Sequence, residues 1–385
     1  LTATVEVTPI FEGCSGTPQS FTITVNPTAQ VEPISSIVIC HGQEVSDILF
    51  STENTNGTTI YSWLNSNDYI GLDSSGTGDI DSFIAFNETN EPVIATITVT
   101  PSYDDPLLLC TGDEPILFTI TVNPLGQVNQ PADIVVCNQE ETTIDFETLN
   151  SGGATSYTWV VTGDAVGLSS STSSVVDSIN DITFTAVNET TDTLTATIAV
   201  TPIFEGCTGP SKQFSITVNP TAQVDPVNSI VICHGQEVLD DDILFSTENT
   251  NGTTIYNWEN SNDYIGLDSS GTGDIDSFIA FNETNEPVTA TIIVTPSYDD
   301  PLLLCTGEPI LFTITVNPSA QVNQPDDVTF CNGVDSSIIE FTTLNEGGET
   351  YYTWTNNNSS IGLDADGADF VPVFTPINNT TQPIE

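Results

Sequence analysis

The chain has 385 residues with 53 acidic side chains and a single basic one, so its formal net charge is −52. Nucleic acids and anionic membrane surfaces are bound through lysine and arginine, so both functions are excluded, as is direct insertion into a membrane because no apolar run reaches about 18 residues. The sequence GxxxxGK[ST] is also absent, which excludes a P-loop enzyme.

The sequence repeats with a period of about 97 residues. Residues 28–124 and 221–318 are nearly identical and define repeat type A, while 125–220 represents a second type, B. We therefore predict five segments: the C-terminal part of a truncated repeat at 1–27, type A at 28–124, type B at 125–220, type A at 221–318, and the N-terminal part of a truncated type B repeat at 319–385. The two partial segments lead us to expect a section of a longer array.

The local signals within the repeat 28–124 are nearly all those of β-strands. The predicted strands, in chain order, are Ser36–Cys40, Asp47–Thr52, Thr58–Leu64, Asp81–Asn87, Val93–Thr100 and Ile116–Val122. About seven short antiparallel strands in such a length are typical of an immunoglobulin-like β-sandwich. We predict an all-β chain of tandem sandwiches, joined by short proline-containing linkers into an extended rod.

Differences between the two type A repeats indicate which strand faces are buried. Positions 94 and 98 carry Ile and Thr, and their counterparts 289 and 293 carry Thr and Ile, so this face tolerates either polarity and is predicted to be solvated. The opposite face, Val93, Ala95, Ile97 and Val99, is predicted to be core. The same argument turns the tryptophan of each repeat inward, and the predicted core tryptophans are Trp63, Trp159, Trp258 and Trp354.

Eight cysteines at regular places, without a CxxC sequence, predict disulfides formed in an oxidising compartment. We favour bridges within each repeat, namely Cys40–Cys110, Cys137–Cys207 and Cys233–Cys305. Cys14 and Cys331 then have no partner within this sequence. The alternative scheme joins the cysteines that flank each linker, namely Cys14–Cys40, Cys110–Cys137, Cys207–Cys233 and Cys305–Cys331.

No catalytic constellation is found, because GxSxG and HExxH are absent and nearly every polar group occurs at least twice. We therefore predict that the protein is not an enzyme. His41 and His234 occupy the same place in the two type A repeats and are predicted to be solvated turn residues. Asn-x-Ser/Thr sequences are weak evidence for glycans; they begin at Asn56, Asn87, Asn188, Asn251 and Asn282.

Pairs of carboxylates in loops are the candidates for a metal site. They are Asp79, Asp81, Asp104, Asp105, Asp274, Asp276, Asp299 and Asp300. Calcium prefers such oxygen ligands, although no EF-hand pattern is present and solvated turn residues are the alternative interpretation. Calcium is thus the one cofactor that the sequence suggests.

The opening of the type A repeat, SIVICHGQEV at Ser36–Val45, and its close, ATITVTP…CTG…FTITVNP, carry a family resemblance. Along its whole length the chain resembles the PKD-like, immunoglobulin-like repeats of giant cell-surface adhesins of gliding Bacteroidota, including the gliding-motility adhesin. The resemblance implies type IX secretion, an outer-membrane-associated extracellular location, and filaments that contact the secretion and gliding machinery through regions outside this sequence.

From this resemblance and the repeats we predict a stalk segment of a repetitive, secreted cell-surface adhesin that contributes to attachment and gliding motility. Its partners would be extracellular surfaces or polysaccharides, contacted by many repeats at once. Two alternatives stay open. One is a spacer or accessory module of a secreted polysaccharide-degrading enzyme, and the other is a calcium-rigidified extender of another surface-binding adhesin.

Overall fold

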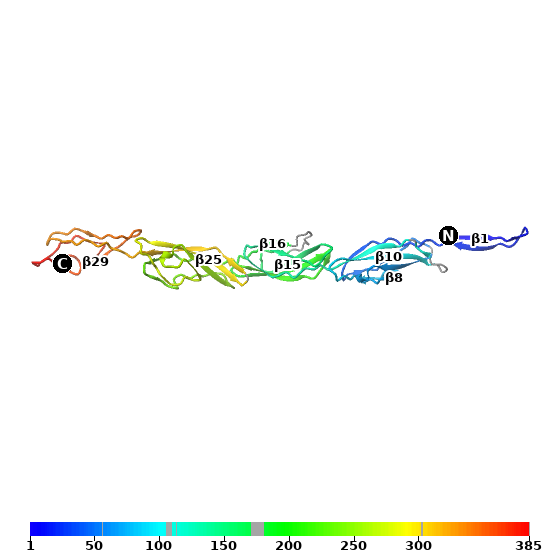
Figure 1. The fold of residues 1–385 in the computed structure, drawn as a ribbon, viewed down its shortest axis with the longest axis horizontal. Coiled ribbons are helices and arrows are strands. Elements are labelled where there is room, and N and C mark those ends of the chain that lie inside the picture. Colours follow the sequence, from blue (N-terminus) through cyan, green and yellow to red (C-terminus); the bar gives the residue numbers. More distant parts are fainter. Residues whose placement is uncertain (56, 105–109, 113, 171–180, 302, 385) are drawn as a thin grey trace. The chain divides into compact units, whose positions relative to one another are not determined.

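The computed structural model describes residues 1–384 except 56, 105–109, 113, 171–180 and 302. Within these residues the protein consists of β-strands and their connections, with three short 3-10 turns (Figure 1). It divides into two compact units. The first comprises Leu1–Ile134, Glu140–Ala186 and Thr195–Thr217, and the second Val135–Gln139, Val187–Leu194 and Val218–Glu385. No helix among the described residues has the length and apolar character needed to cross a membrane.

The repeat 28–124, in the first unit, forms a six-stranded and a two-stranded sheet. The strand order of the large sheet is β5-β12-β10-β7-β8, with β11 also pairing with β10, while β6 and β9 form the small sheet. The elements are β5 (Ile37–Cys40), β6 (Glu44–Val45), β7 (Thr58–Asn65), η1 (Asp68–Ile70), β8 (Ser75–Thr77), β9 (Phe83–Ile84), β10 (Val93–Asp104), β11 (Cys110–Thr111) and β12 (Ile116–Asn123).

The predicted strand faces of this repeat are confirmed. On β10, Ala95, Ile97 and Val99 are fully buried and Val93 is half-buried against the same core, whereas Ile94 on the opposite face is 57% exposed. Trp63 of β7 lies in the core, and its ring packs against Gly76 of β8, where a Cβ atom would collide with it. Alternating burial with period two is what a half-buried strand requires.

Two of the predicted strands are wrong in extent. Residues 47–52 make a single bridge, between Ile48 and Ile80, and Phe50 donates its N–H to Asp79 Oδ1 at 2.7 Å instead of to a neighbouring strand. Residues 81–87 contain only the two-residue β9. A side-chain carboxylate thus replaces a strand partner here, and propensity alone does not show this.

One pairing departs from the expected antiparallel pattern. β5 runs parallel to β12, with Cys40 opposite Asn123. The first strand of the repeat therefore lies beside the last one and points in the same direction. This places the opening cysteine at the end of the sheet where β12 ends and the following linker begins.

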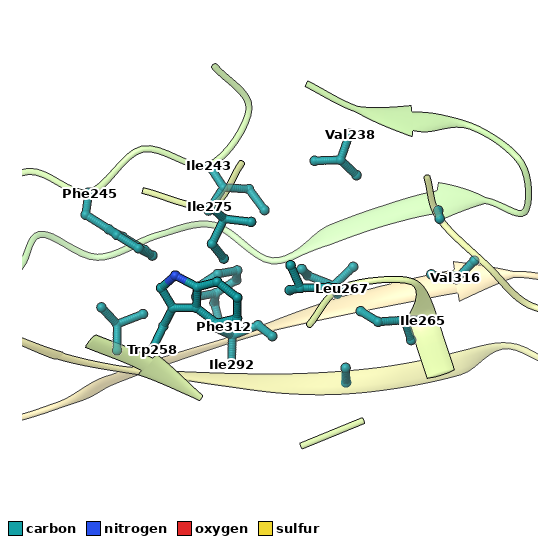
Figure 2. Close-up of a cluster of buried hydrophobic side chains, with 14 of the residues drawn as sticks. Val238, Ile243, Phe245, Trp258, Ile265, Leu267, Ile275, Ile292, Phe312 and Val316 are labelled. Atoms are coloured by element: carbon teal, nitrogen blue, oxygen red, sulfur yellow. The ribbon is translucent and has the colours of Figure 1, made fainter. Parts of the chain in front are cut away.

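The repeat 221–318, in the second unit, has the same architecture, with strand order β20-β27-β25-β22-β23, β26 beside β25, and β21 paired with β24. Its core gathers around Trp258, Ile265 and Ile292 (Figure 2). The elements are β20 (Ile230–Cys233), β21 (Glu237–Val238), β22 (Thr253–Asn260), η2 (Asp263–Ile265), β23 (Ser270–Thr272), β24 (Phe278–Ile279), β25 (Val288–Asp300), β26 (Leu303–Thr306) and β27 (Ile310–Asn317).

The other segments contain shorter sets of strands. In 1–27 these are β1 (Thr2–Val7), β2 (Ile10–Phe11), β3 (Cys14–Ser15) and β4 (Gln19–Thr24). In 125–220 they are β13 (Ile134–Cys137), β14 (Glu141–Asp145), β15 (Thr155–Gly163), β16 (Asp181–Thr185), β17 (Leu194–Phe204), β18 (Cys207–Thr208) and β19 (Lys212–Asn219). In 319–384 they are β28 (Ile339–Glu340), β29 (Thr353–Thr355), η3 (Ser359–Ile361), β30 (Asp366–Ala368) and β31 (Phe370–Val371). The fold class, tandem immunoglobulin-like β-sandwiches, is confirmed.

Candidate functional site

The two cysteines of the repeat 28–124 lie at opposite ends of its large sheet. Cys40 faces Asn123 at the end of β12, beside the start of β10 at Val93. Cys110 faces Tyr103, ten residues further along β10. At about 3.3 Å per residue this separates them by roughly 33 Å. A disulfide requires Cα atoms within about 7 Å, so a bridge between Cys40 and Cys110 is impossible in this fold.

The structure instead joins consecutive repeats. Cys40 is bonded to Cys207 and Cys137 to Cys305, each with a Cα–Cα distance of 5.5 Å. The opening cysteine of one repeat is thus bonded to the closing cysteine of the next. The predicted bridges Cys40–Cys110, Cys137–Cys207 and Cys233–Cys305 are therefore wrong, and so is the alternative scheme across each linker. We call these two bonds the inter-repeat disulfides.

The other four cysteines, all within the described residues, form no disulfide; they are Cys14, Cys110, Cys233 and Cys331. Cys233 is equivalent to the bonded Cys40 in its local setting. The backbone N–H of Cys40 donates to Gln43 Oε1 at 3.4 Å, and that of Cys233 donates to Gln236 Oε1 at 3.1 Å. The surrounding turn is therefore the same whether or not the thiol is bonded.

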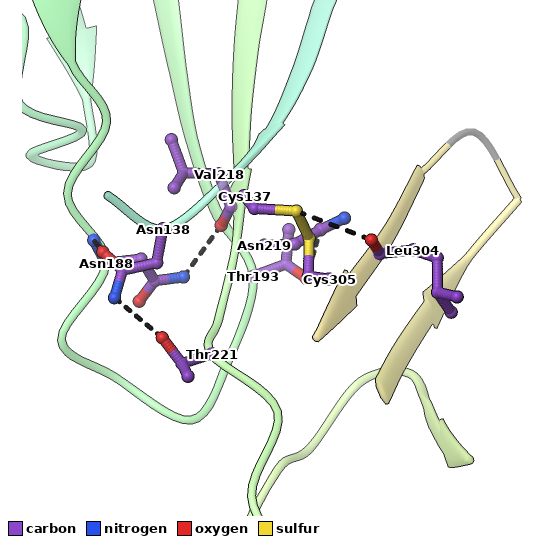
Figure 3. Close-up of a disulfide and its surroundings, with 9 residues drawn as sticks. All are labelled: Cys137, Asn138, Asn188, Thr193, Val218, Asn219, Thr221, Leu304 and Cys305. Carbon is purple, nitrogen blue, oxygen red and sulfur yellow. Dashed lines mark hydrogen bonds between the residues drawn. A yellow bond between two sulfur atoms is a disulfide. The ribbon is translucent and has the colours of Figure 1, made fainter. Parts of the chain in front are cut away.

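The second inter-repeat disulfide lies close to Thr193 and Asn219 (Figure 3) and beside the ring of Tyr298. Cys305 is 2% exposed and packs in a small cluster with Tyr298 and Ala222. The hydroxyl of Tyr298 is 3.1 Å from Thr193 Oγ1 and donates to the carbonyl oxygen of Asn251 at 2.9 Å. A tyrosine of the repeat 221–318 thereby contacts the end of the preceding repeat beside the bridge. These contacts belong to the second unit.

One asparagine in each repeat holds the linker by which the chain enters that repeat. Asn150 Oδ1 accepts the N–H of Gln127 at 2.6 Å, and its Nδ2 donates to the carbonyl oxygen of Leu125 at 3.2 Å. Thr148 Oγ1 donates to the same Oδ1 and orients the amide. Equivalent bonds are made by Asn54, Asn249 and Asn345. We call this arrangement the linker clamp. It fixes each linker to the repeat that follows.

Backbone hydrogen bonds repeat at three junctions. The N–H of Ser151 donates to the carbonyl oxygen of Asn90 at 2.8 Å. The same kind of bond joins Thr250 to Thr191 at 3.0 Å and Glu346 to Asn285 at 2.8 Å. Each of the three bonds lies within one of the two units. A disulfide, a clamped linker and a loop-to-loop hydrogen bond together describe the candidate functional site, which is the junction between repeats.

Three of the Asn-x-Thr sequences prove to be structural. Asn188 is 1% exposed; its Nδ2 donates to the carbonyl oxygens of Asp192 at 2.7 Å and Val218 at 2.8 Å, and its Oδ1 accepts two bonds from Thr190. Asn87 and Asn282 are equally buried. A glycan needs that same Nδ2, so these three positions are wrong as glycan candidates. Asn251 is exposed, and Asn56 lies outside the described residues.

The two histidines are more than solvated turn residues. His41 Nδ1 accepts the backbone N–H of Asn87 at 2.9 Å, and the imidazole packs edge-on against Phe86. His234 makes the same bond to Asn282. In the repeat 125–220 the Oδ1 of Asn138 accepts the equivalent N–H at 2.8 Å. The loop that begins at Asn87, Asn188 or Asn282 is therefore anchored by one side-chain acceptor in both repeat types. The acceptor is an imidazole in type A and an amide in type B.

The candidate calcium ligands are scattered. The described residues contain no group of three or more His, Cys, Asp or Glu side chains that could hold a metal ion. Asp79 and its counterpart Asp274 each accept a backbone N–H at 2.7 Å, while Asp81, Asp104, Asp276 and Asp299 are exposed. Asp300 is half-buried at the end of β25, and Asp105 lies outside the described residues. A calcium site at these loops stays a prediction.

The tyrosine two residues before each type A tryptophan lies at the edge of the core. Burial first, and then the charge of Asp79, raises the pKa of Tyr61 above its usual value. The pKa of Tyr256 is raised for the same reasons, with Asp225 and Asp274 as the charged neighbours. Trp63 and Trp258 are buried as predicted, whereas Trp159 and Trp354 are half-buried and donate their indole N–H to carbonyl oxygens.

Comparisons with known proteins find similarity to solved structures only. No family model and no curated protein matches the chain. Among solved structures it is similar to titin domains I67-I69 in an E-to-A variant (11% identity, TM-score 0.41, 76% of this chain and 97% of that one). It is also similar to the eight N-terminal Ig domains of DSCAM (12%, 0.38, 98% and 47%) and to the human desmocollin-1 ectodomain (12%, 0.30, 95% and 77%).

Proposed function

We propose that this chain is a covalently braced stalk segment of a repetitive extracellular adhesin and has no catalytic role. The observation that carries the proposal is the pair of inter-repeat disulfides, each beside a linker that is clamped to the following repeat. A disulfide placed between repeats restricts how they move relative to each other. Such a bond serves a protein whose function is to hold a fixed span between two points.

Two further features support the proposal, one for the extracellular location and one for the extended form of the stalk. Structural disulfides form and persist in oxidising compartments. The chain also carries 53 carboxylates against one basic side chain, so surface ion pairs cannot hold its repeats together. Like charges repel over about 8 Å at physiological salt, which favours extension and keeps neighbouring filaments apart. Covalent bridges then supply the cohesion that opposite charges supply elsewhere.

The finer assignment is to a filament of the gliding Bacteroidota type, exported by type IX secretion and displayed at the outer membrane. It is supported by the sequence resemblance of the repeat opening and close. In this proposal the repeats bind surfaces or polysaccharides weakly and many times over, which gives avidity without one strong site. The secretion and gliding machinery would act on other parts of the same protein.

Antibodies against the chain test the proposal on cells that produce it. The expected result is labelling of intact cells, with Fab fragments reducing attachment to glass or polysaccharide and slowing gliding. Fab fragments against an unrelated surface protein serve as the control. Labelling only after lysis would overturn the extracellular location. Labelling without any effect on attachment, together with polysaccharide hydrolysis by the full-length protein, would overturn the adhesin in favour of a spacer in a secreted enzyme.

A further inference from the structure

The inter-repeat disulfides define closed loops in the covalent chain. The bond between Cys40 and Cys207 encloses residues 41–206, and the bond between Cys137 and Cys305 encloses residues 138–304. Each loop contains most of two consecutive repeats. A force that enters the chain before Cys40 and leaves it after Cys207 therefore has a covalent route through the sulfur atoms that avoids the enclosed residues.

We propose that the two disulfides act as overlapping bypasses that limit how far tension can lengthen the chain. The limit does not depend on which surface the protein binds, so it goes beyond the proposed function. An ordinary array of β-sandwiches lengthens greatly when a domain unfolds under load. Here, unfolding inside a bypassed loop releases almost no length, because the two ends of the loop stay bonded.

Chain lengths give the size of the effect across two repeats. From residue 28 to residue 220 the route through the Cys40–Cys207 bond contains about 25 residue steps outside the loop, which extend to at most about 90 Å. Without the bond the same span has about 190 steps and extends to about 690 Å. The bypass thus shortens the fully extended length of this span by close to nine tenths.

The residues left outside each bypass are themselves held in the folded state. For the first loop these are residues 28–40 and 207–220. Thr28 and Gln30 are bonded to Asn54 of the linker clamp and Ile37–Cys40 forms β5, while residues 207–220 contain β18 and β19. The linker clamp and the disulfide therefore act on adjacent segments, residues 28–40 and the enclosed residues 41–206. The clamp holds the short segment that still bears tension, and the disulfide removes the long one from the load.

Overlap of the two loops has a measurable consequence. With both bonds present, the shortest covalent path runs from Leu1 to Cys40, back from Cys207 to Cys137, and on from Cys305 to Glu385. This path has about 190 steps in place of about 380, so its full extension is about 690 Å in place of about 1,380 Å. Breaking either bond alone lengthens the path by only about 28 steps, or about 100 Å. Breaking both adds about 690 Å.

Single-molecule force spectroscopy on the full 385-residue chain, held by its two ends, tests this inference. The measured quantity is the contour length after the last unfolding event, for the unaltered protein and for C40S, C137S and C40S/C137S. Expected values are about 690 Å, 790 Å, 790 Å and 1,380 Å. Thiols that form no disulfide are alkylated in every sample before the measurement, which prevents bonds between molecules.

Treatment of the unaltered protein with a phosphine reductant gives a second measurement that does not depend on how the variants fold. The expected contour length is that of the double variant. Bridges within each repeat would instead give an increase of about 250 Å for C137S alone, since about 70 residues would be released. That result would overturn the inference. So would an increase in contour length for the double variant that equals the sum of the two single increases, or a contour length that does not change on reduction.

Discussion

Replacing the buried Asn188 tests the structural role assigned to the Asn-x-Thr sequence. The side chain is 1% exposed, with two donated and two accepted hydrogen bonds between 2.7 and 3.0 Å. Net contributions of about 1 kcal/mol per bond predict that Asn188→Ala lowers the free energy of unfolding by about 3–4 kcal/mol. For a repeat of about 97 residues, each kcal/mol lowers the melting temperature by about 4–8 °C.

Differential scanning calorimetry is the suitable assay, because a change at one repeat should move one transition and leave the others in place. Asn188→Asp adds a second readout. It keeps the two accepted hydrogen bonds, but it turns both donated bonds into contacts between oxygen atoms and buries a negative charge. Its loss of unfolding free energy at neutral pH should therefore become smaller as the pH falls and the carboxyl group is protonated.

Glu189→Ala is the matched control, since Glu189 lies in the same loop with an exposed side chain and should change stability by less than about 0.5 kcal/mol. The reasoning is refuted if Asn188→Ala and Glu189→Ala unfold at the same temperature. Detection of a glycan on Asn188 in protein from its native source would refute it as well.

Three further predictions concern the linker clamp, the loop anchor and the edge of the core. Asn150→Ala should cost about 2 kcal/mol and speed hydrogen exchange at the Gln127 amide, which loses its acceptor; unchanged exchange would contradict the clamp. His41→Asn should keep the free energy of unfolding within about 1 kcal/mol of that of the unaltered protein, because an asparagine amide already accepts the equivalent N–H in the type B repeat. His41→Ala removes the acceptor and should lower the free energy of unfolding further, as measured by thermal melting. Burial and nearby carboxylates raise the folded pKa of Tyr256 above its unfolded value of about 10, so its neutral form contributes stability that is present below pH 10 and lost as the pH rises through the folded pKa. Alkaline melting of Tyr256→Phe should lack this part of the loss, and identical alkaline melting curves would argue against it.

The sequence was sufficient for the features that depend on repetition and alternation. Twin repeats that differ at 94 and 98 and agree at 95 and 97 predicted the buried face of β10 correctly, because a period of two places alternate residues on opposite faces. The inward position of Trp63 followed from the same comparison. Short elements were harder, since Asp79 binds the Phe50 N–H where a strand was expected, and one carboxylate contact leaves no periodic signal.

Disulfide pairing was beyond prediction because it depends on the ends of the sheet. The two cysteines of one repeat are about 70 residues apart, and for that reason bridges within each repeat were predicted. The available signal was the length of the strand between them, since Val93–Tyr103 already spans about 33 Å and carries Cys110 away from Cys40. Recognising this required the parallel pairing of β5 with β12, which no local pattern indicates. The partner in the next repeat then follows from which end of the sheet each cysteine occupies.

Disulfide mapping tests the central claim, that consecutive repeats are covalently joined, most directly. The protein would be alkylated without reduction, digested with a protease that cleaves after acidic residues, and examined by mass spectrometry for linked peptides. Peptides containing Cys40 are expected to be joined to peptides containing Cys207, and Cys137 peptides to Cys305 peptides, with both pairs separating on reduction. A Cys40 peptide joined to a Cys110 peptide, or a Cys137 peptide joined to a Cys207 peptide, would contradict it.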